Sequence, residues 1–121
     1  MIQVIRPLHV AVLVSDLAKA EAFYGDLLGL PQVERSLNFS GTWYQVGEVQ
    51  IHLILAETPP STLVNPQKWG RNPHLVLAIA DLQTAQSALN AAGLPYQLSA
   101  SGRAALFVRD PDGNIVELSQ A

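Results

Sequence analysis

The first half of the chain alternates between large aliphatic and other side chains in two segments, residues 5–14 and residues 49–55. A period of two is typical of β-strands, because successive side chains point to opposite faces of a sheet. In the first segment one face carries Leu8, Val10, Val12 and Val14, and the other carries His9, Ala11 and Leu13. In the second, one face carries Val49, Ile51, Leu53 and Leu55, and the other carries Gln50, His52 and Ile54. Each strand is therefore expected to bury its aliphatic face and to present a histidine on the opposite one.

Between these strands, apolar positions recur with helical spacing at residues 17, 20, 24, 27 and 28. Ser15 or Asp16 is expected to cap this helix, and Gly29 to end it. Shorter strands are predicted at residues 32–37 and 43–46, followed by a turn at 47–48. The first half of the chain thus predicts a β-α-β-β-β unit.

The second half nearly repeats the first at an offset of 65 residues, with His74 in the place of His9. An Asp-Leu pair follows each of these histidines by seven and eight positions. The same offset relates His52 to Glu117. Such self-similarity indicates a duplicated unit. Strands are accordingly predicted at residues 74–80, 95–99, 103–109 and 114–119, with a helix at 82–92 that Asp81 caps.

These elements predict an α+β fold with two tandem β-α-β-β-β modules, at about residues 5–56 and 74–120. The segment 57–73 is proline-rich and aperiodic, and is expected to be the linker. Halves of about sixty residues are marginal alone, so we expect a single domain over residues 1–121. If the helices cover the aliphatic faces, the other faces form a cupped mixed sheet around a shared cavity, with the helices on its outer face.

Polar residues with metal-ligating groups occupy the equivalent positions on these strands, and they are expected to converge in the cup: His9, His52, His74 and Glu117. Three imidazoles and a carboxylate suit a divalent ion such as Zn, Ni, Co, Mn or Fe. His9, His74 and Glu117 alone have the composition of a 2-His-1-carboxylate triad, with His52 as a fourth ligand or a base. The alternative is that each histidine is a hydrogen-bonded structural residue. That alternative leaves unexplained why the chain has no other histidine.

Two further sets of residues have both a functional and a structural interpretation. Arg103 and Arg109 could hold a substrate carboxylate, although surface salt bridges are the more frequent use of arginine. The residues that could line the cavity are Tyr44, Tyr96, Phe107 and Arg109, although a Tyr or Phe in a strand more often belongs to the core. Trp69 in the linker either covers a pocket or partner, or anchors the loop.

Composition narrows the class of protein. A net charge of −3 with scattered signs argues against a nucleic-acid partner, which requires a basic surface. The chain contains no run of about 18 apolar residues, so no membrane association is expected. It has no cysteine and no recognisable leader, which is compatible with a cytoplasmic protein.

The chain resembles the vicinal oxygen chelate superfamily, which includes glyoxalase I, bleomycin resistance proteins and extradiol dioxygenases. The matching elements are His9 with Asp16-Leu17, the segment Phe23 to Leu30, His74 with Asp81-Leu82, and Asp110-Pro111-Asp112-Gly113-Asn114 leading to Glu117. The resemblance implies paired modules around a divalent metal, with His9, His52, His74 and Glu117 as ligands. It also implies a small-molecule substrate and a homodimer.

The function expected from this resemblance is a metal-dependent enzyme acting on a small substrate with two adjacent oxygens. Glu117 and His52 would be the catalytic residues of a metal-assisted proton transfer, as in an isomerase or a lyase. Leu13 stands where glyoxalase I tends to carry a glutathione-binding arginine, which disfavours a glutathione-linked substrate. Two alternatives are an Fe(II) ring-cleaving dioxygenase and a non-catalytic binding or resistance protein that uses the same cup.

Overall fold

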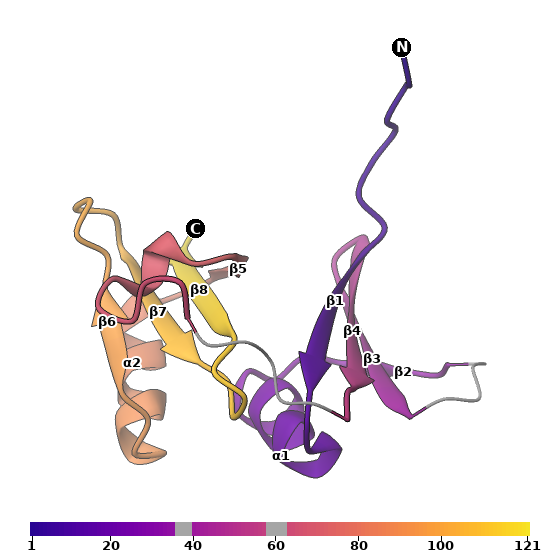
Figure 1. Cartoon of the computed structure of the whole chain (residues 1–121). Coiled ribbons are helices and arrows are strands. Elements are labelled where there is room, and N and C mark those ends of the chain that lie inside the picture. Colours follow the sequence, from indigo (N-terminus) through magenta and orange to yellow (C-terminus); the bar gives the residue numbers. More distant parts are fainter. Residues whose placement is uncertain (36–39, 58–62) are drawn as a thin grey trace. The chain divides into compact units, whose positions relative to one another are not determined.

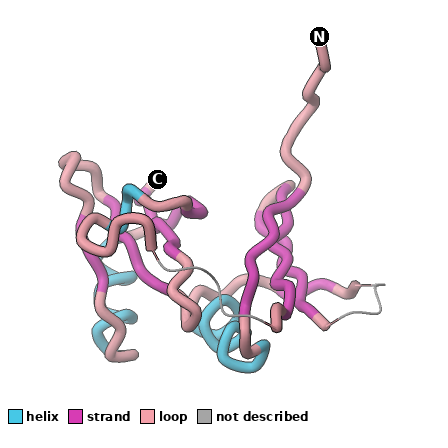
Figure 2. The backbone as a smooth tube through the Cα atoms, in the orientation of Figure 1, coloured by secondary structure: helices cyan, strands magenta, loops and turns pink. Residues whose placement is uncertain are grey.

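A computed structural model describes residues 1–35, 40–57 and 63–121. The chain divides into two compact units, residues 1–60 and 61–121, and the division falls within the predicted linker. Each unit contains a four-stranded mixed sheet and helical segments, as Figures 1 and 2 show. The predicted α+β class and the two tandem β-α-β-β-β modules are confirmed.

The first unit contains the strands β1 (His9–Val14), β2 (Gln32–Val33), β3 (Gly41–Val46) and β4 (Val49–Leu55). Their order in the sheet is β1-β4-β3-β2, and only the β1–β4 pair is parallel. The helix α1 (Leu17–Glu21) continues directly into the π-helical turn η1 (Ala22–Leu27). The N-cap is Asp16, whose carboxylate accepts a hydrogen bond from the Lys19 amide at 3.0 Å.

The second unit repeats this topology with β5 (His74–Ile79), β6 (Tyr96–Leu98), β7 (Ala105–Arg109) and β8 (Ile115–Gln120), in the order β5-β8-β7-β6. Its helix is α2 (Leu82–Ala91), which the Asp81 side chain caps through the Thr84 amide. A short 3-10 helix, η2 (Trp69–Arg71), precedes β5. In both units the helix is followed by a glycine with positive φ, Gly29 at 71° and Gly93 at 70°, as expected for helix ends.

The central residues of the aliphatic faces are buried, as the alternation predicts, whereas Leu8, Val10 and Leu55 of the predicted faces are exposed. In the first unit α1 contacts β3 and β4, and the core contains Val12, Val14, Phe23, Tyr24, Tyr44, Ile51 and Leu53. In the second unit α2 contacts β8, and the core contains Leu89, Leu106, Val108, Val116 and Leu118. Tyr44 therefore belongs to the core, in agreement with its structural interpretation. The opposite face of each sheet carries the candidate ligands.

Several predicted boundaries require correction. The first strand begins at His9 and not at residue 5, because Pro7 lacks an amide proton and β4 begins at Val49, opposite that end of the strand. The predicted strand 32–37 ends at Val33, and its residues 36 and 37 lie outside the described ranges. The strand predicted at 103–109 starts at Ala105. No helix in the described ranges is long and apolar enough to cross a membrane.

Candidate functional site

The parallel strand pairs place the candidate ligands in the same register in both units. In the first unit His9 lies opposite Gln50, and His52 opposite Ala11. In the second unit His74 lies opposite Ile115, and Glu117 opposite Val76. The two candidates of each unit are therefore diagonal neighbours on one face of the sheet. The equivalence that the sequence repeat predicts is present in the strand pairing.

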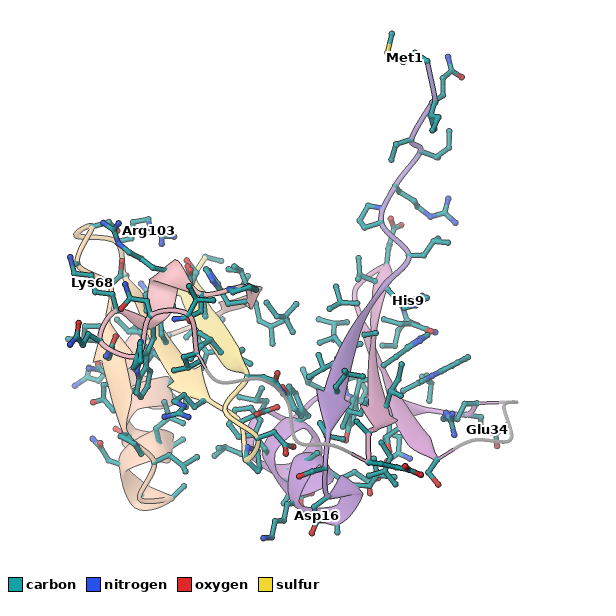
Figure 3. The ribbon with its side chains drawn as sticks, viewed as in Figure 1. Met1, His9, Asp16, Glu34, Lys68 and Arg103 are labelled. Carbon is teal, nitrogen blue, oxygen red and sulfur yellow. The ribbon has the colours of Figure 1, made fainter. Side chains whose placement is uncertain are left out.

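In the first unit, three aromatic rings stack across neighbouring strands. The ring centroids of His9 and His52 are 4.0 Å apart with an interplanar angle of 13°. The His52 ring also stacks on the Trp43 ring, with centroids 4.1 Å apart and an interplanar angle of 7°. The Arg35 guanidinium lies 5.8 Å from the centroid of the Trp43 ring. His52 is thus held between two flat rings, whereas His9 at the end of the stack is exposed (Figure 3).

The surroundings of His52 favour its neutral form. The residue is 8% exposed, and its Nε2 lies 2.8 Å from Oε1 of Gln50. Burial is the main cause that lowers the pKa of His52 below its ordinary 6.5, and the positive charges of His9 and Arg35 lower it further. A neutral imidazole keeps one ring nitrogen with a lone pair, which can bind a metal ion or accept a proton.

In the second unit, Glu117 lies between a histidine and an arginine. Its Oε1 is 3.2 Å from Nε2 of His74, and its Oε2 is 3.0 Å from Nη1 of Arg103. The side chain of Glu117 is only 4% exposed, whereas that of Arg103, which lies on the loop before β7, is 54% exposed (Figure 3). Phe107 contacts the His74 ring edge-on, with centroids 5.5 Å apart. Arg103 thus neutralises one oxygen of the carboxylate and leaves the other directed at His74.

The proton positions on His74 follow from its two polar neighbours. The carbonyl oxygen of Asn72 can only accept a hydrogen bond, and it lies 2.6 Å from Nδ1, so Nδ1 carries a proton. A neutral His74 then has its lone pair on Nε2, which faces the Glu117 carboxylate. Two acceptors at this distance require a cation between them, either a second proton on His74 or a metal ion.

The separation of these two atoms fits a shared metal ion. Nitrogen and oxygen ligands bind Zn²⁺ at about 2.1 Å, so two adjacent ligands lie about 3.0–3.4 Å apart. The measured 3.2 Å between Nε2 and Oε1 falls in this range. The hydrogen bond from Nδ1 to a backbone carbonyl is also the usual support for a metal-binding histidine. The residues present in this unit therefore fit part of a metal site.

The four predicted ligands occur as two pairs, His9 with His52 and His74 with Glu117. Across residues 1–35, 40–57 and 63–121, no three side chains of the His, Cys, Asp or Glu type gather closely enough to hold one ion. Each unit by itself carries two of the candidate ligands. Convergence of all four residues at a single ion stays a prediction.

The segment before β5 shapes the surroundings of His74. The buried side chain of Asn72 accepts from the Asn65 amide at 2.9 Å and donates to the carbonyl oxygens of Asn65, Lys68 and Trp69. Trp69 donates its amide to Gln97 and its ring nitrogen to the Pro66 carbonyl, and η2 contacts β8. The Arg109 guanidinium lies 5.7 Å from the Trp69 ring centroid. Trp69 therefore anchors the loop, in agreement with the structural interpretation of this residue.

A pocket of about 320 Å³ lies beside this segment of the second unit. It is lined by Lys68, Trp69, Gly70, Arg71, Gln97, Leu98, Ser99, Ala100, Ser101 and Phe107. Phe107 lines this pocket and also contacts the His74 ring edge-on. Trp69 thus lines a pocket as well as anchoring its loop.

The sequence interpretation missed three residues that support the ligands: Gln50, Trp43 and Asn72. Gln50 could have been found, because the period of two places it on the same face as His52. The stacking of Trp43 depends on its position opposite His52 in the β3–β4 register. The role of Asn72 depends on the folding of a segment without periodicity, and no local sequence signal indicates it.

Comparisons with known proteins agree with this architecture. A putative glyoxalase family protein from Bacillus anthracis has a TM-score of 0.77 at 22% identity, covering 99% of this chain and 98% of that chain. Lactoylglutathione lyase from Agrobacterium tumefaciens has a TM-score of 0.69 at 24% identity, covering 96% and 93%. TnmS3, an antibiotic binding protein from Streptomyces sp. CB03234, has a TM-score of 0.72 at 22% identity, covering 99% and 98%. At these identities the likeness shows the fold.

The search of curated proteins gave no match to the chain. A family model, however, matches residues 6–118, nearly the whole sequence, including both strand pairs that carry the candidate ligands. The chain therefore belongs to the Glyoxalase/Bleomycin resistance protein/Dioxygenase superfamily, which the sequence resemblance predicted.

Proposed function

We propose that this protein is a divalent-metal-dependent enzyme that acts on a small substrate with two adjacent oxygens. The metal ligands in this proposal are His9, His52, His74 and Glu117. The observation that carries it is the pairing of His74 with Glu117, in which Nε2 and Oε1 lie 3.2 Å apart, a separation that fits a shared metal ion, while Nδ1 donates to the Asn72 carbonyl. Members of the superfamily are generally metal-dependent and bind small molecules, which supports the same assignment.

The chemistry of the donors suits a divalent ion such as Zn, Ni, Co, Mn or Fe. Imidazole suits Zn, Ni, Co and Fe, and a carboxylate also suits Mn. A divalent ion at these residues would stabilise negative charge that develops on two adjacent oxygens of the substrate. Arg103 keeps the second oxygen of Glu117 engaged, so that Glu117 would bind through Oε1 alone.

Two side chains in the proposal are suited to move a proton, as in an isomerase or a lyase. His52 is held neutral by burial and by its positive neighbours, and a neutral imidazole can accept a proton from carbon or oxygen. Glu117 is a buried carboxylate with one oxygen directed away from Arg103. A group in this role is a base beside the ion and leaves the ion to the other ligands; it takes a proton from one carbon of the substrate and returns it to the neighbouring one.

The side chains around the candidate ligands favour a substrate with an apolar portion. Ala11, Leu13, Val76 and Ala78 lie on the ligand-bearing faces of β1 and β5, and all four are exposed. Burying such side chains against a ligand is favourable at roughly 25 cal/mol per Å² of apolar surface. An enediolate or a catecholate with a hydrophobic substituent meets this description.

The proposal includes a homodimer and a cytoplasmic location. Members of the superfamily often form dimers. Each unit supplies two of the four ligands, so the set is completed either by both units of one chain or by units of two chains. The cytoplasmic location rests on the sequence, which contains no cysteine.

Two other functions remain as alternatives. Bound Fe(II) would make a ring-cleaving dioxygenase, for which His9, His74 and Glu117 have the required donor types. A non-catalytic binding protein is favoured by the stack of His9, His52 and Trp43, because flat rings bind planar molecules by stacking. One of the structurally similar proteins is described as an antibiotic binding protein.

Elemental analysis of protein purified without a metal-affinity tag tests the proposal. We expect about one transition-metal ion per chain in the wild type and its loss in His74→Ala and Glu117→Gln. Glu48→Gln, at an exposed turn, is the matched control and should keep the metal. Circular dichroism must show that the variants are folded. A wild-type protein that contains no metal and binds none on addition would exclude the metal-dependent functions and favour the binding protein.

A further inference from the structure

A chain of three side-chain hydrogen bonds leads from the β3–β4 turn to His52. Nε2 of Gln45 donates to the Gly47 carbonyl at 2.8 Å, and Nε2 of Gln50 donates to Oε1 of Gln45 at 2.9 Å. Oε1 of Gln50 then lies 2.8 Å from Nε2 of His52. Gln45 and Gln50 are directly opposite each other in the β3–β4 register, so the two strands hold both amides in place.

The direction of this chain follows from its end at a backbone carbonyl. A carbonyl oxygen only accepts, so the Gln45 atom that faces Gly47 must be the amide nitrogen. The Gln45 oxygen then faces Gln50 and must accept from its amide nitrogen. This leaves the Gln50 oxygen for His52, whose Nε2 must carry the proton. A neutral His52 therefore has its lone pair on Nδ1.

We propose that Gln50, itself oriented by Gln45, is a positioning residue that holds His52 in the Nε2–H tautomer and presents Nδ1 as the metal-binding atom. The metal-binding part of this inference rests on the proposed function, whereas the tautomer depends only on the hydrogen bonds. The two units would then present different ring nitrogens, Nδ1 of His52 and Nε2 of His74, because their hydrogen-bonded supports lie on opposite sides of the ring. Trp43 and His9 stack on the faces of the His52 ring and restrict its tilt.

The tautomer is tested by long-range proton–nitrogen NMR of the metal-free protein labelled at histidine, with assignments from His9→Gln and His74→Gln. For His52 we expect a protonated Nε2 with an observable proton and a non-protonated Nδ1. In Gln50→Leu that proton should be lost to exchange with water, and the two nitrogens should move toward averaged shifts. Gln50→Glu keeps the acceptor for Nε2 of His52 but loses the donor to Gln45, whose amide can turn over and donate to the new carboxylate, so Nε2 should stay protonated. Gln32→Leu, at an exposed position of β2, is the control for a change of the same residue type.

Titration with Co²⁺ tests the second part. Loss of a supporting hydrogen bond typically costs about 10–100-fold in metal affinity, and we expect this loss in Gln50→Leu but not in Gln50→Glu or Gln32→Leu. A proton on Nδ1 in the wild type, or an unchanged His52 spectrum in Gln50→Leu, would overturn the positioning role. If the tautomer is as expected but the wild type does not bind Co²⁺, the positioning of His52 stands and the proposed metal site fails.

Discussion

Nε2 of His74 lies 3.2 Å from Oε1 of Glu117, although the two residues are 43 positions apart in the sequence. The parallel pairing of β5 with β8 brings them together, and the first unit brings His9 and His52 together in the same way. Each unit therefore carries one pair of candidate ligands on the face of its sheet opposite the aliphatic core.

Arg103→Ala should destabilise the second unit. Glu117 is buried, and without Arg103 its carboxylate keeps, among the described residues, only the contact with Nε2 of His74. Hydrogen bonds to charged groups contribute about 1.5 kcal/mol or more, so we expect a loss of about that size in the free energy of unfolding, measured by urea denaturation. Arg71→Ala, at an exposed arginine of η2, should have little effect. Equal losses in the two variants would show that the Arg103 ion pair does not contribute.

The stability of the protein should depend on pH through His52. Burial, followed by the charges of His9 and Arg35, lowers the pKa of His52 in the folded state below 6.5, so the unfolded chain binds its proton more readily. The contribution to stability is therefore fully present above pH 6.5 and is lost as the pH falls toward the lowered pKa. Urea denaturation at several pH values should give a flatter dependence for His52→Gln than for the wild type. Parallel curves would contradict the lowered pKa.

Tyr44→Phe should leave the protein at least as stable as the wild type. The Tyr44 hydroxyl is buried without a hydrogen-bond partner among the described residues, and burial with the charges of Glu21 and Asp26 raises its pKa to about 12. Removing an unsatisfied polar atom is neutral or stabilises by up to about 1 kcal/mol. Tyr96→Phe, whose hydroxyl accepts from Gln86, is the control. A clear loss of thermal stability in Tyr44→Phe would mean that the hydroxyl has a partner in solution.

Gly70→Ala should disturb the support of His74. A Cβ at this position would lie 2.6 Å from Cζ of Phe107, and Phe107 contacts the His74 ring. We expect a loss of about 1–3 kcal/mol from this overpacking. Phe107→Leu removes the atoms in conflict, so the double variant should lose less stability than the sum of the single variants. Additive losses in denaturant would show that Gly70 and Phe107 are not coupled.

Much of the fold could be predicted from the sequence because its signals are local. Asp16 and Asp81 each precede a helical pattern and do cap the helices α1 and α2. The alternation at residues 49–55 predicted β4 with its bounds and the burial of Ile51 and Leu53, although Leu55 is exposed and His52 is buried. Where the local signal was weak, as at the start of β1, the boundary depended on whether the neighbouring strand extends that far.

The candidate site was predicted only as two equivalent pairs of positions. The repeat at an offset of 65 residues placed His9 with His52 and His74 with Glu117, since duplicated units share one strand register. The repeat did not indicate the residues around these pairs. Gln50 hydrogen-bonds to His52 and Trp43 stacks on it. The Asn72 carbonyl hydrogen-bonds to His74, and Arg103 pairs with Glu117.

The sequence by itself determined the repeated topology and the residues that share a face with each histidine, because side-chain periodicity and helix capping act over a few residues. The tertiary structure decided which atom of each side chain faces which partner. That choice depends on strand register and on the path of the segment before β5, where contacts between distant residues select one rotamer and one proton position. The ring nitrogen that His52 or His74 keeps for chemistry is therefore a property of the folded chain.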